Sequence, residues 1–225
     1  MPPVLEFQLA SLAAASAAER GVEGLTFSLE PGQAAWLECE METTAVDLAC
    51  GLRAPAAGAA RYQGRAWAEC APEEQAARRG AIGRVFWDTA WISNLDVDEN
   101  IALARRHHDP ARPGLWREET HRLAGELGLV LAPGLRPAFA SGRDLQRAQF
   151  VRALLGSPAL LILEHPDRHL TADDAARVLA RVAVARAAGA AVLWAGPATA
   201  RLNPDTASAE VRLDLRGGTT MVKSA

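Results

Sequence analysis

Residues 140–170, ASGRDLQRAQFVRALLGSPALLILEHPDRHL, indicate the fold class most directly. A Ser-Gly turn opens this stretch, and the apolar residues after it recur at helical spacing as far as Leu155. A continuous apolar run from Leu160 to Leu163 then predicts a buried strand that ends at Glu164. We therefore expect a turn, a helix that carries arginines, and a buried strand with an acidic end, in that order.

This order of features resembles the signature helix and the Walker B strand of ATP-binding cassette (ABC) ATPases. The family writes LSGGQ, then QRVAxARAL, then LLLLDEP, and the chain keeps this frame at residues 140–144, 146–147, 152–154 and 160–163. The resemblance covers nearly the whole chain in order. It implies an α/β, P-loop NTPase-like (ABC cassette) core with an N-terminal antiparallel β subdomain and an α-helical lobe. We expect one cassette-like domain over 1–225, with 1–87 and 157–225 as core and β subdomain and 88–156 as the helical lobe.

Composition sets limits on the kind of protein this is. With 225 residues, 49% of them hydrophobic, the chain can bury one core of ordinary size. Its net charge of -3 gives no bulk positive field for nucleic acid or for an anionic membrane. Three cysteines without C-x-x-C spacing favour a reducing compartment. We identify no signal peptide, and no apolar run reaches the roughly 18 to 20 residues that span a bilayer.

The connection after the strand at Ala34 to Leu37 departs from the family. A Walker A loop, G-x-x-x-x-G-K-[ST], needs glycines whose N–H groups converge on phosphate, a lysine, and a hydroxyl for Mg²⁺. Here the residues are Glu38-Cys39-Glu40-Met41-Glu42, Glu42 stands where the lysine would be, and the only lysine of the chain is Lys223. Each carboxylate would repel a triphosphate by about 1 to 4 kcal/mol. Alternatively, the glutamates complement the positive end of the following helix.

Other positions of the family's nucleotide face are also replaced. Trp87 takes the place of the Q-loop glutamine, Glu164-His165 that of the Asp-Glu pair, and Gly196 that of the switch histidine. Thr43 and Thr44 remain as hydroxyls of a Walker A remnant, or as the N-cap of the next helix. From these replacements we expect a degenerate pseudo-ATPase that is not an enzyme, has no resident metal, and meets ATP and Mg²⁺ only through a partner cassette.

The Ser141-Gly142 turn is the part of the nucleotide site that the chain retains. In the family each ATP lies between one subunit's Walker face and the other subunit's signature turn, so Ser141 and Gly142 are expected to contact ATP held by a partner. Arg143 and Asp144 replace a glycine and a glutamine, which puts close backbone approach in doubt. The alternative is that Ser141 only caps the helix.

Two tryptophans follow the replaced glutamine at a spacing of four residues. Trp87 and Trp91 either pack internally or line the cleft where a permease docks in transporters. The segment from Trp91 to His107 resembles cassettes of MCE/Mla-type lipid transport systems. His165 and His169 are four apart, but Pro166 makes a continuous helix and a metal pair unfavourable there.

Local signals place the remaining elements. We expect an edge strand at 4–9, a strand at 25–29, helix starts at Asp96 and Thr171 with an acidic residue three positions on, a strand at 190–195, and a terminal hairpin over 209–215 and 219–222.

Three functions follow from these residues. The first is a non-hydrolysing cassette subunit that pairs with a second cassette and a membrane permease, on the inner face of the cell membrane, in a transport complex for lipids. The second is a homodimeric scaffold that works without nucleotide. The third is an enzyme that uses Glu164 and His165 in altered chemistry.

Overall fold

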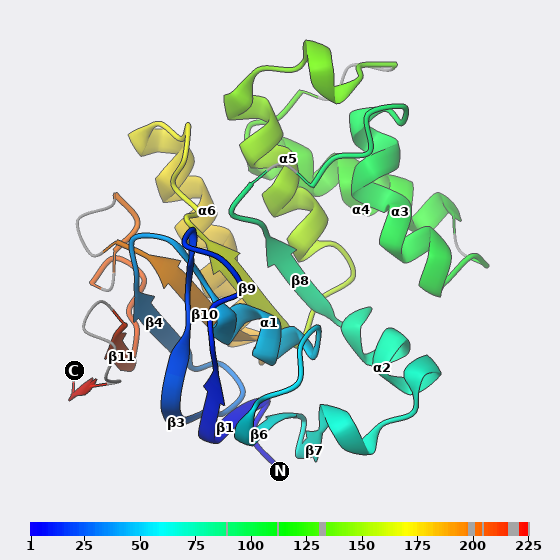
Figure 1. Cartoon of the computed structure of the whole chain (residues 1–225). Helices are drawn as coiled ribbons and strands as arrows, with labels where there is room; N and C mark the ends of the chain where they lie inside the picture. The colour runs from blue at the N-terminus through cyan, green and yellow to red at the C-terminus, as the bar shows by residue number, and fades with distance from the viewer. Residues whose placement is uncertain are drawn as a thin grey trace.

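A computed structural model describes residues 1–88, 90–111, 113–130, 134–197, 201–203, 205–215 and 221–224. The described residues form two large sheets, a small two-stranded sheet and a group of helices, with both termini near the antiparallel sheet and the edge of the core sheet (Figure 1). No helix among the described residues is long and apolar enough to cross a membrane.

The core sheet is mainly parallel and contains the strand predicted from residues 160–163. Its order is β12-β11-β4-β10-β9-β8, in which β12 alone is antiparallel to its neighbour. The central strands are buried along their whole length, which agrees with their continuous apolar sequences. The strands are β4 (Ala34–Glu38), β8 (Ile82–Val85), β9 (Leu160–Glu164), β10 (Ala191–Gly196), β11 (Val211–Asp214) and β12 (Met221–Ser224). The predicted terminal hairpin is confirmed, although Thr219 and Thr220 lie outside the described residues.

The antiparallel sheet has the order β3-β1-β6-β7. It is formed by β1 (Leu5–Leu12), β3 (Val22–Leu29), β6 (Ala57–Tyr62) and β7 (Arg65–Ala66). The prediction that the first strand lies at an edge is wrong, because β1 pairs with β3 on one side and with β6 on the other. Alternation of side chains does not distinguish an edge strand from a central one, and the small residues of β6 carry little strand signal.

The helices begin where capping residues predict. Thr43 caps α1 (Thr44–Cys50), and Gly51 ends it in the left-handed conformation. The Glu99 carboxylate accepts the Asp96 N–H at 3.0 Å before α3 (Val97–His108), and Thr171 and Asp174 cap α6 (Ala172–Ala187) reciprocally. The other helices are α2 (Pro72–Arg79), α4 (Pro113–Glu126), α5 (Gly142–Leu154), and the short 3₁₀ turns η1 (Trp67–Glu69) and η2 (Pro137–Phe139).

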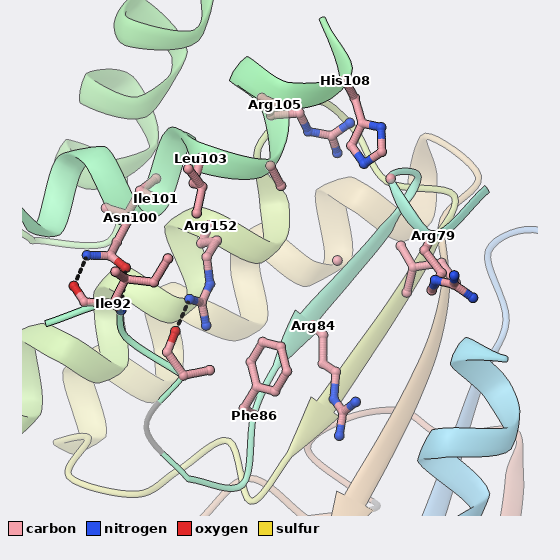
Figure 2. Close-up of a pocket in the computed structure, with 15 residues that line it drawn as sticks. Arg79, Arg84, Phe86, Ile92, Asn100, Ile101, Leu103, Arg105, His108 and Arg152 are labelled. Carbon is pink, nitrogen blue, oxygen red and sulfur yellow. Dashed lines mark hydrogen bonds between the residues drawn. The ribbon is translucent and has the colours of Figure 1, made fainter. Parts of the chain in front are cut away.

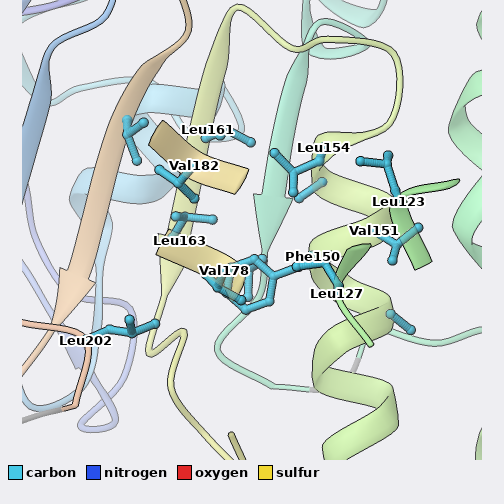
Figure 3. Packing of buried hydrophobic residues seen from close by; sticks show 14 of the residues in the cluster. Leu123, Leu127, Phe150, Val151, Leu154, Leu161, Leu163, Val178, Val182 and Leu202 are labelled. Atoms are coloured by element: carbon cyan, nitrogen blue, oxygen red, sulfur yellow. The ribbon is translucent and has the colours of Figure 1, made fainter. Parts of the chain in front are cut away.

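Helix α5 joins the helical group to the core sheet. It lies beside α3 and α4 in Figure 1 and also packs against β8. The Phe150 and Leu154 side chains of α5 are buried in the same cluster as Leu163 of β9 and Val178 of α6 (Figure 3). Burying an aliphatic or aromatic side chain of this size stabilises the fold by about 1.5 to 3 kcal/mol. The start of α5, with the Ser141-Gly142 turn, is therefore held firmly relative to the sheet.

Candidate functional site: the carboxyl edge of the core sheet

The carboxyl ends of three neighbouring strands bring the replaced positions together. Glu38 ends β4, Glu164 ends β9, and Gly196 ends β10. In the register, Gly196 lies opposite Glu38, and Ala195 lies opposite Glu164. The Trp36 indole N–H donates to the Gly196 carbonyl at 3.1 Å, so the end of β10 is tied to β4.

The connection from β4 to α1 is paired with another segment. Its last residues form the short strand β5 (Glu42–Thr43), which runs parallel to β2 (Glu19–Arg20). The Thr43 hydroxyl accepts the Ala45 N–H at 3.3 Å, and the Thr44 hydroxyl donates to the Leu12 carbonyl at 3.2 Å. Both threonines are buried, at 4% and 0% exposure. Their hydroxyls are already engaged within the chain, so this geometry lends no support to a nucleotide contact at Thr43 or Thr44.

Glu164 is occupied by a cation from the chain itself. Its carboxylate is 3% exposed and accepts the Arg84 Nε–H of β8 at 2.6 Å. The Asp47 carboxylate of α1 lies 3.7 Å from Arg84 Nη1. Burial raises the pKa of Glu164, and the Arg84 guanidinium opposes this shift. The arginine thus balances the strand-end carboxylate that would otherwise face a metal ion.

His165 faces a hydrophobic neighbour. Its ring centroid lies 3.7 Å from that of Trp87 in an edge-on arrangement, and its φ of 41° is in the left-handed region. Among the described residues, no hydrogen-bond partner reaches its buried Nε2. Burial lowers the pKa of His165 to about 4, so the ring is neutral at pH 7. A search of the described residues finds no group of three or more His, Cys, Asp or Glu side chains that could hold a metal ion.

The residues of this face do not fit Mg·ATP. Glu40 and Glu42 are exposed at the connection where glycines and a lysine would cradle phosphate. Glu164 binds Arg84 and cannot also coordinate a metal ion without breaking a buried ion pair. His165 stands where the family has the glutamate of its Asp-Glu pair. Its neutral ring packs against Trp87 and offers no carboxylate to orient water.

The Ser141-Gly142 turn, in contrast, is open. Ser141 caps α5: its hydroxyl accepts the Asp144 N–H at 3.1 Å and donates to the Asp144 carboxylate at 2.7 Å. This confirms the capping role. Ser141 and Gly142 are both exposed, and the first N–H groups of a helix have no partner within the helix.

Arg143 is turned away from the turn that precedes it. Its guanidinium binds Asp174 of α6, with Nε at 2.6 Å and Nη2 at 3.0 Å from the two carboxylate oxygens. Arg147 binds the same carboxylate, with its Nε at 2.9 Å. The replacement of glycine by Arg143 therefore leaves the Ser141-Gly142 turn uncovered.

The two tryptophans lie beside this turn and are half-buried. Trp87 and Trp91 line a small cavity of about 70 Å³ together with Gly142 and Leu145. The Arg168 guanidinium donates to the Trp87 carbonyl at 2.6 Å, and Trp91 packs against the core. Internal packing accounts for part of each ring, and the rest of each surface is accessible to a partner.

Sequence reasoning missed Arg84 and Arg152. Arg84 lies in the four-residue strand β8, and its side chain is only 16% exposed. A largely buried arginine needs an acidic neighbour, and this requirement could have paired it with Glu164. Arg152 was recognised only as part of the α5 frame. Its guanidinium lies 4.7 Å from the Trp91 ring and 5.1 Å from the Phe86 ring, which depends on tertiary packing.

No family model matches the chain, but curated proteins and solved structures do. The chain is 27% identical to the cell division ATP-binding protein FtsE of Escherichia coli K12 over 159 residues, which cover 69% of this chain and 70% of FtsE. It is 38% identical over 136 residues to the sulfate/thiosulfate import ATP-binding protein CysA 2 of Chromobacterium violaceum, covering 60% of this chain and 34% of that protein.

The solved structures match over nearly the full length. An ATP-binding subunit of an ABC transporter superposes with a TM-score of 0.82 at 20% identity, covering 98% of this chain and 90% of that chain. The ATP-binding cassette MJ0796, a dimer with ADP and Pi in a post-hydrolysis state, gives 0.82 at 16% identity, covering 98% of both chains. The predicted P-loop NTPase-like cassette fold is confirmed, and the sequence similarities support the ABC transporter ATP-binding cassette family.

One expectation is contradicted by these similarities. We expected the chain not to be an enzyme, whereas FtsE and CysA 2 are named ATP-binding proteins and the MJ0796 cassette was captured after hydrolysis. The replaced positions all belong to one face of a cassette: Glu42, Trp87, Glu164, His165 and Gly196.

Proposed function

We propose that the chain is an ATP-binding cassette subunit of a membrane transport complex, in which it pairs with a second cassette and docks on a permease. The fold and the sequence similarity to ATP-binding subunits support the cassette role. The similarity to a cassette that was solved as a dimer supports the pairing. This role places the chain on the inner face of the membrane.

The observation that carries the proposal is the exposed Ser141-Gly142 turn, capped at α5 and left open by Arg143. We assign it the contact with an ATP whose phosphates and Mg²⁺ are held by the partner cassette. A helix start with free N–H groups and a positive dipole end favours an anionic ligand. The chain then takes part in ATP hydrolysis through a composite site, and its own Walker face is not the one that grips the phosphates.

A matched pair of glycine variants tests the composite site. Gly142→Asp places a carboxylate at the turn, where an added Cβ meets only the His169 ring at an ordinary 3.4 Å. An acidic residue in the first turn of a helix does not destabilise it. Gly125→Asp is the control, since nothing lies within 4 Å of a Cβ added there on α4.

The complex is purified with its native partners and its ATPase rate is measured. We expect Gly142→Asp to lower the rate by about tenfold or more, since a repulsion of about 1 to 4 kcal/mol opposes the ATP phosphates. Gly125→Asp should retain the wild-type rate. Equal rates in all three proteins would refute the contact. If purification from native membranes recovers the chain only with further copies of itself, the nucleotide-independent scaffold is favoured.

We assign the permease contact to Trp87 and Trp91, on the surface that they leave accessible beside Gly142. Truncation of an aromatic anchor at the centre of an interface commonly weakens binding by about 2 to 4 kcal/mol. Trp91→Ala should therefore weaken recovery of the permease with the chain, whereas Phe139→Ala, which truncates an exposed aromatic residue of η2, should not. Equal recovery with both variants would remove the assignment.

A lipid cargo is the remaining part of the proposal. It rests on the resemblance of residues 91–107 to cassettes of MCE/Mla-type systems. Extraction and mass analysis of lipids from the purified complex tests it. Phospholipid in stoichiometric amounts is the expected result, and a complex that lacks bound lipid but stimulates its ATPase with a small soluble substrate would contradict it.

A further inference from the structure

A second, larger cavity lies between β8 and helix α3, apart from the Ser141-Gly142 turn. Its volume is about 310 Å³, at the lower end of the range for small-molecule sites. Ile82, Ile101 and Leu103 give it apolar walls. Figure 2 shows that the residues around it come from the end of α2, from β8 and the connection after it, and from α3 and α5.

The ionisable residues that line this cavity are all basic. They are Arg79, Arg84, Arg105, Arg152 and His108, and none of the described lining residues is acidic. Arg84 is neutralised by Glu164, and Arg105 donates its Nε–H to the Leu155 carbonyl at 2.8 Å. Burial lowers the pKa of both Arg105 and His108. The cavity therefore presents positive charge that the chain only partly balances.

Arg152 is the least compensated of these groups. Its Nη1 donates to the Ala90 carbonyl at 2.8 Å, as the dashed line in Figure 2 shows, and its guanidinium lies against the Phe86 and Trp91 rings. Its Nη2 is buried and has no hydrogen-bond partner among the described residues. Burial lowers the pKa of Arg152 to about 10, with no opposing carboxylate. A buried guanidinium without a counter-ion is unfavourable unless an anion completes it.

We propose that this cavity binds a small organic anion, a carboxylate carried on an apolar body, with the Arg152 guanidinium as its counter-ion. The apolar walls at Ile101 and Leu103 accommodate the body, and the Arg152 guanidinium, which lines the cavity, attracts the carboxylate. The two aromatic rings hold the guanidinium plane in place, so little side-chain entropy is lost on binding. The inference requires neither a second cassette nor a permease, so it can hold even if the proposed function fails.

Calorimetric titration of the full chain with benzoate tests the site, and benzamide serves as the uncharged ligand of the same shape. For wild type we expect a dissociation constant for benzoate on the order of 1 mM, and binding of benzamide weaker by about tenfold. Arg152→Gln should abolish the preference for benzoate. Arg106→Gln is the control, because Arg106 is the exposed neighbour of Arg105 on α3 and does not line the cavity.

A second variant keeps every arginine in place. Ala104 is exposed and lines the cavity, so Ala104→Phe should fill it without disturbing the core. We expect this variant to bind neither ligand. Absence of saturable benzoate binding by folded wild type would overturn the proposal. Undiminished binding by both Arg152→Gln and Ala104→Phe would also overturn it, since benzoate would then bind elsewhere.

Discussion

At the scale of single residues, the carboxyl edge of the core sheet is held together by internal charge pairing. Glu164 is 3% exposed and pairs with Arg84 at 2.6 Å. A buried pair of this kind adds little net stability, but removal of one partner leaves an uncompensated charge. The Arg84 contact ties the end of β9 to β8, and the Trp36 indole N–H ties the end of β10 to β4.

Substitution of Arg84 alone should therefore be more damaging than substitution of both partners. We expect Arg84→Met to lower the free energy of unfolding by about 3 to 5 kcal/mol. The double variant Arg84→Met, Glu164→Leu should recover most of this loss, because two apolar side chains replace the ion pair. Urea unfolding followed by circular dichroism measures both values. A double variant less stable than Arg84→Met would show that the pairing is not what matters.

His165 predicts a pH dependence of stability. Burial lowers its pKa to about 4 from an ordinary 6.5, so between these values the unfolded chain binds the proton more readily than the folded one. Stability should then fall as the pH is lowered from 7 to 4, by about 1 to 3 kcal/mol through this residue. In His165→Gln that part of the decline should be absent. Parallel stability curves for wild type and variant over this range would contradict the shift.

At the scale of elements, the start of α5 is fixed by α6. Asp174 is 1% exposed and is bound by Arg143 and Arg147 of α5 and by Thr171, which caps α6. Burial alone would raise the pKa of Asp174, but hydrogen bonds from Arg143, the Thr171 N–H and Arg147 together lower it below its ordinary value. The orientation of the Ser141-Gly142 turn thus depends on a carboxylate from another helix.

Loss of that carboxylate should loosen the junction of the two helices. We expect Asp174→Asn to lower the free energy of unfolding by about 3 kcal/mol at pH 7, because two guanidinium groups lose their counter-ion. Asp173→Asn, at the exposed neighbouring position, should change it by less than about 1 kcal/mol.

The same variant also has an expected pH dependence. A carboxyl group whose pKa is lowered in the folded state stabilises the fold above the ordinary pKa of 3.8, and this stabilisation is lost as the pH falls further. The difference between wild type and Asp174→Asn should therefore shrink below about pH 4. A stability difference between wild type and Asp174→Asn that stays constant as the pH falls from about 7 to about 2 would contradict the lowered pKa of Asp174.

Local sequence signals predict where helices and strands lie better than they predict which strands and side chains pair with one another. The caps at Ser141 and Thr171 and the buried strand β9 are read from residues close together in the chain, and the structure contains all of them. The central position of β1 is set by β6, more than 40 residues away by the register of Leu5 with Tyr62, and has no local signal. The same limit applies to the site, because the pairing of Arg84 with Glu164 spans 80 residues.

At the scale of the whole molecule, the cassette fold is retained around a face that does not fit Mg·ATP and a turn that remains open. Glu42 pairs in β5, Glu164 binds Arg84, and the Ser141-Gly142 turn stays exposed. This arrangement agrees with our proposal that the chain completes a nucleotide site that a second cassette begins. Nothing in this arrangement requires the chain to hold ATP when it is alone.

Binding of Mg·ATP, measured by calorimetry for the isolated chain and for its complex with the native partner cassette, tests this account most directly. We expect saturable binding by the complex, weakened by Gly142→Asp in this chain, and no saturable binding by the isolated chain at about 1 mM ATP. Micromolar binding of Mg·ATP by the isolated chain, lost when residues of the β4–α1 connection are substituted, would contradict it.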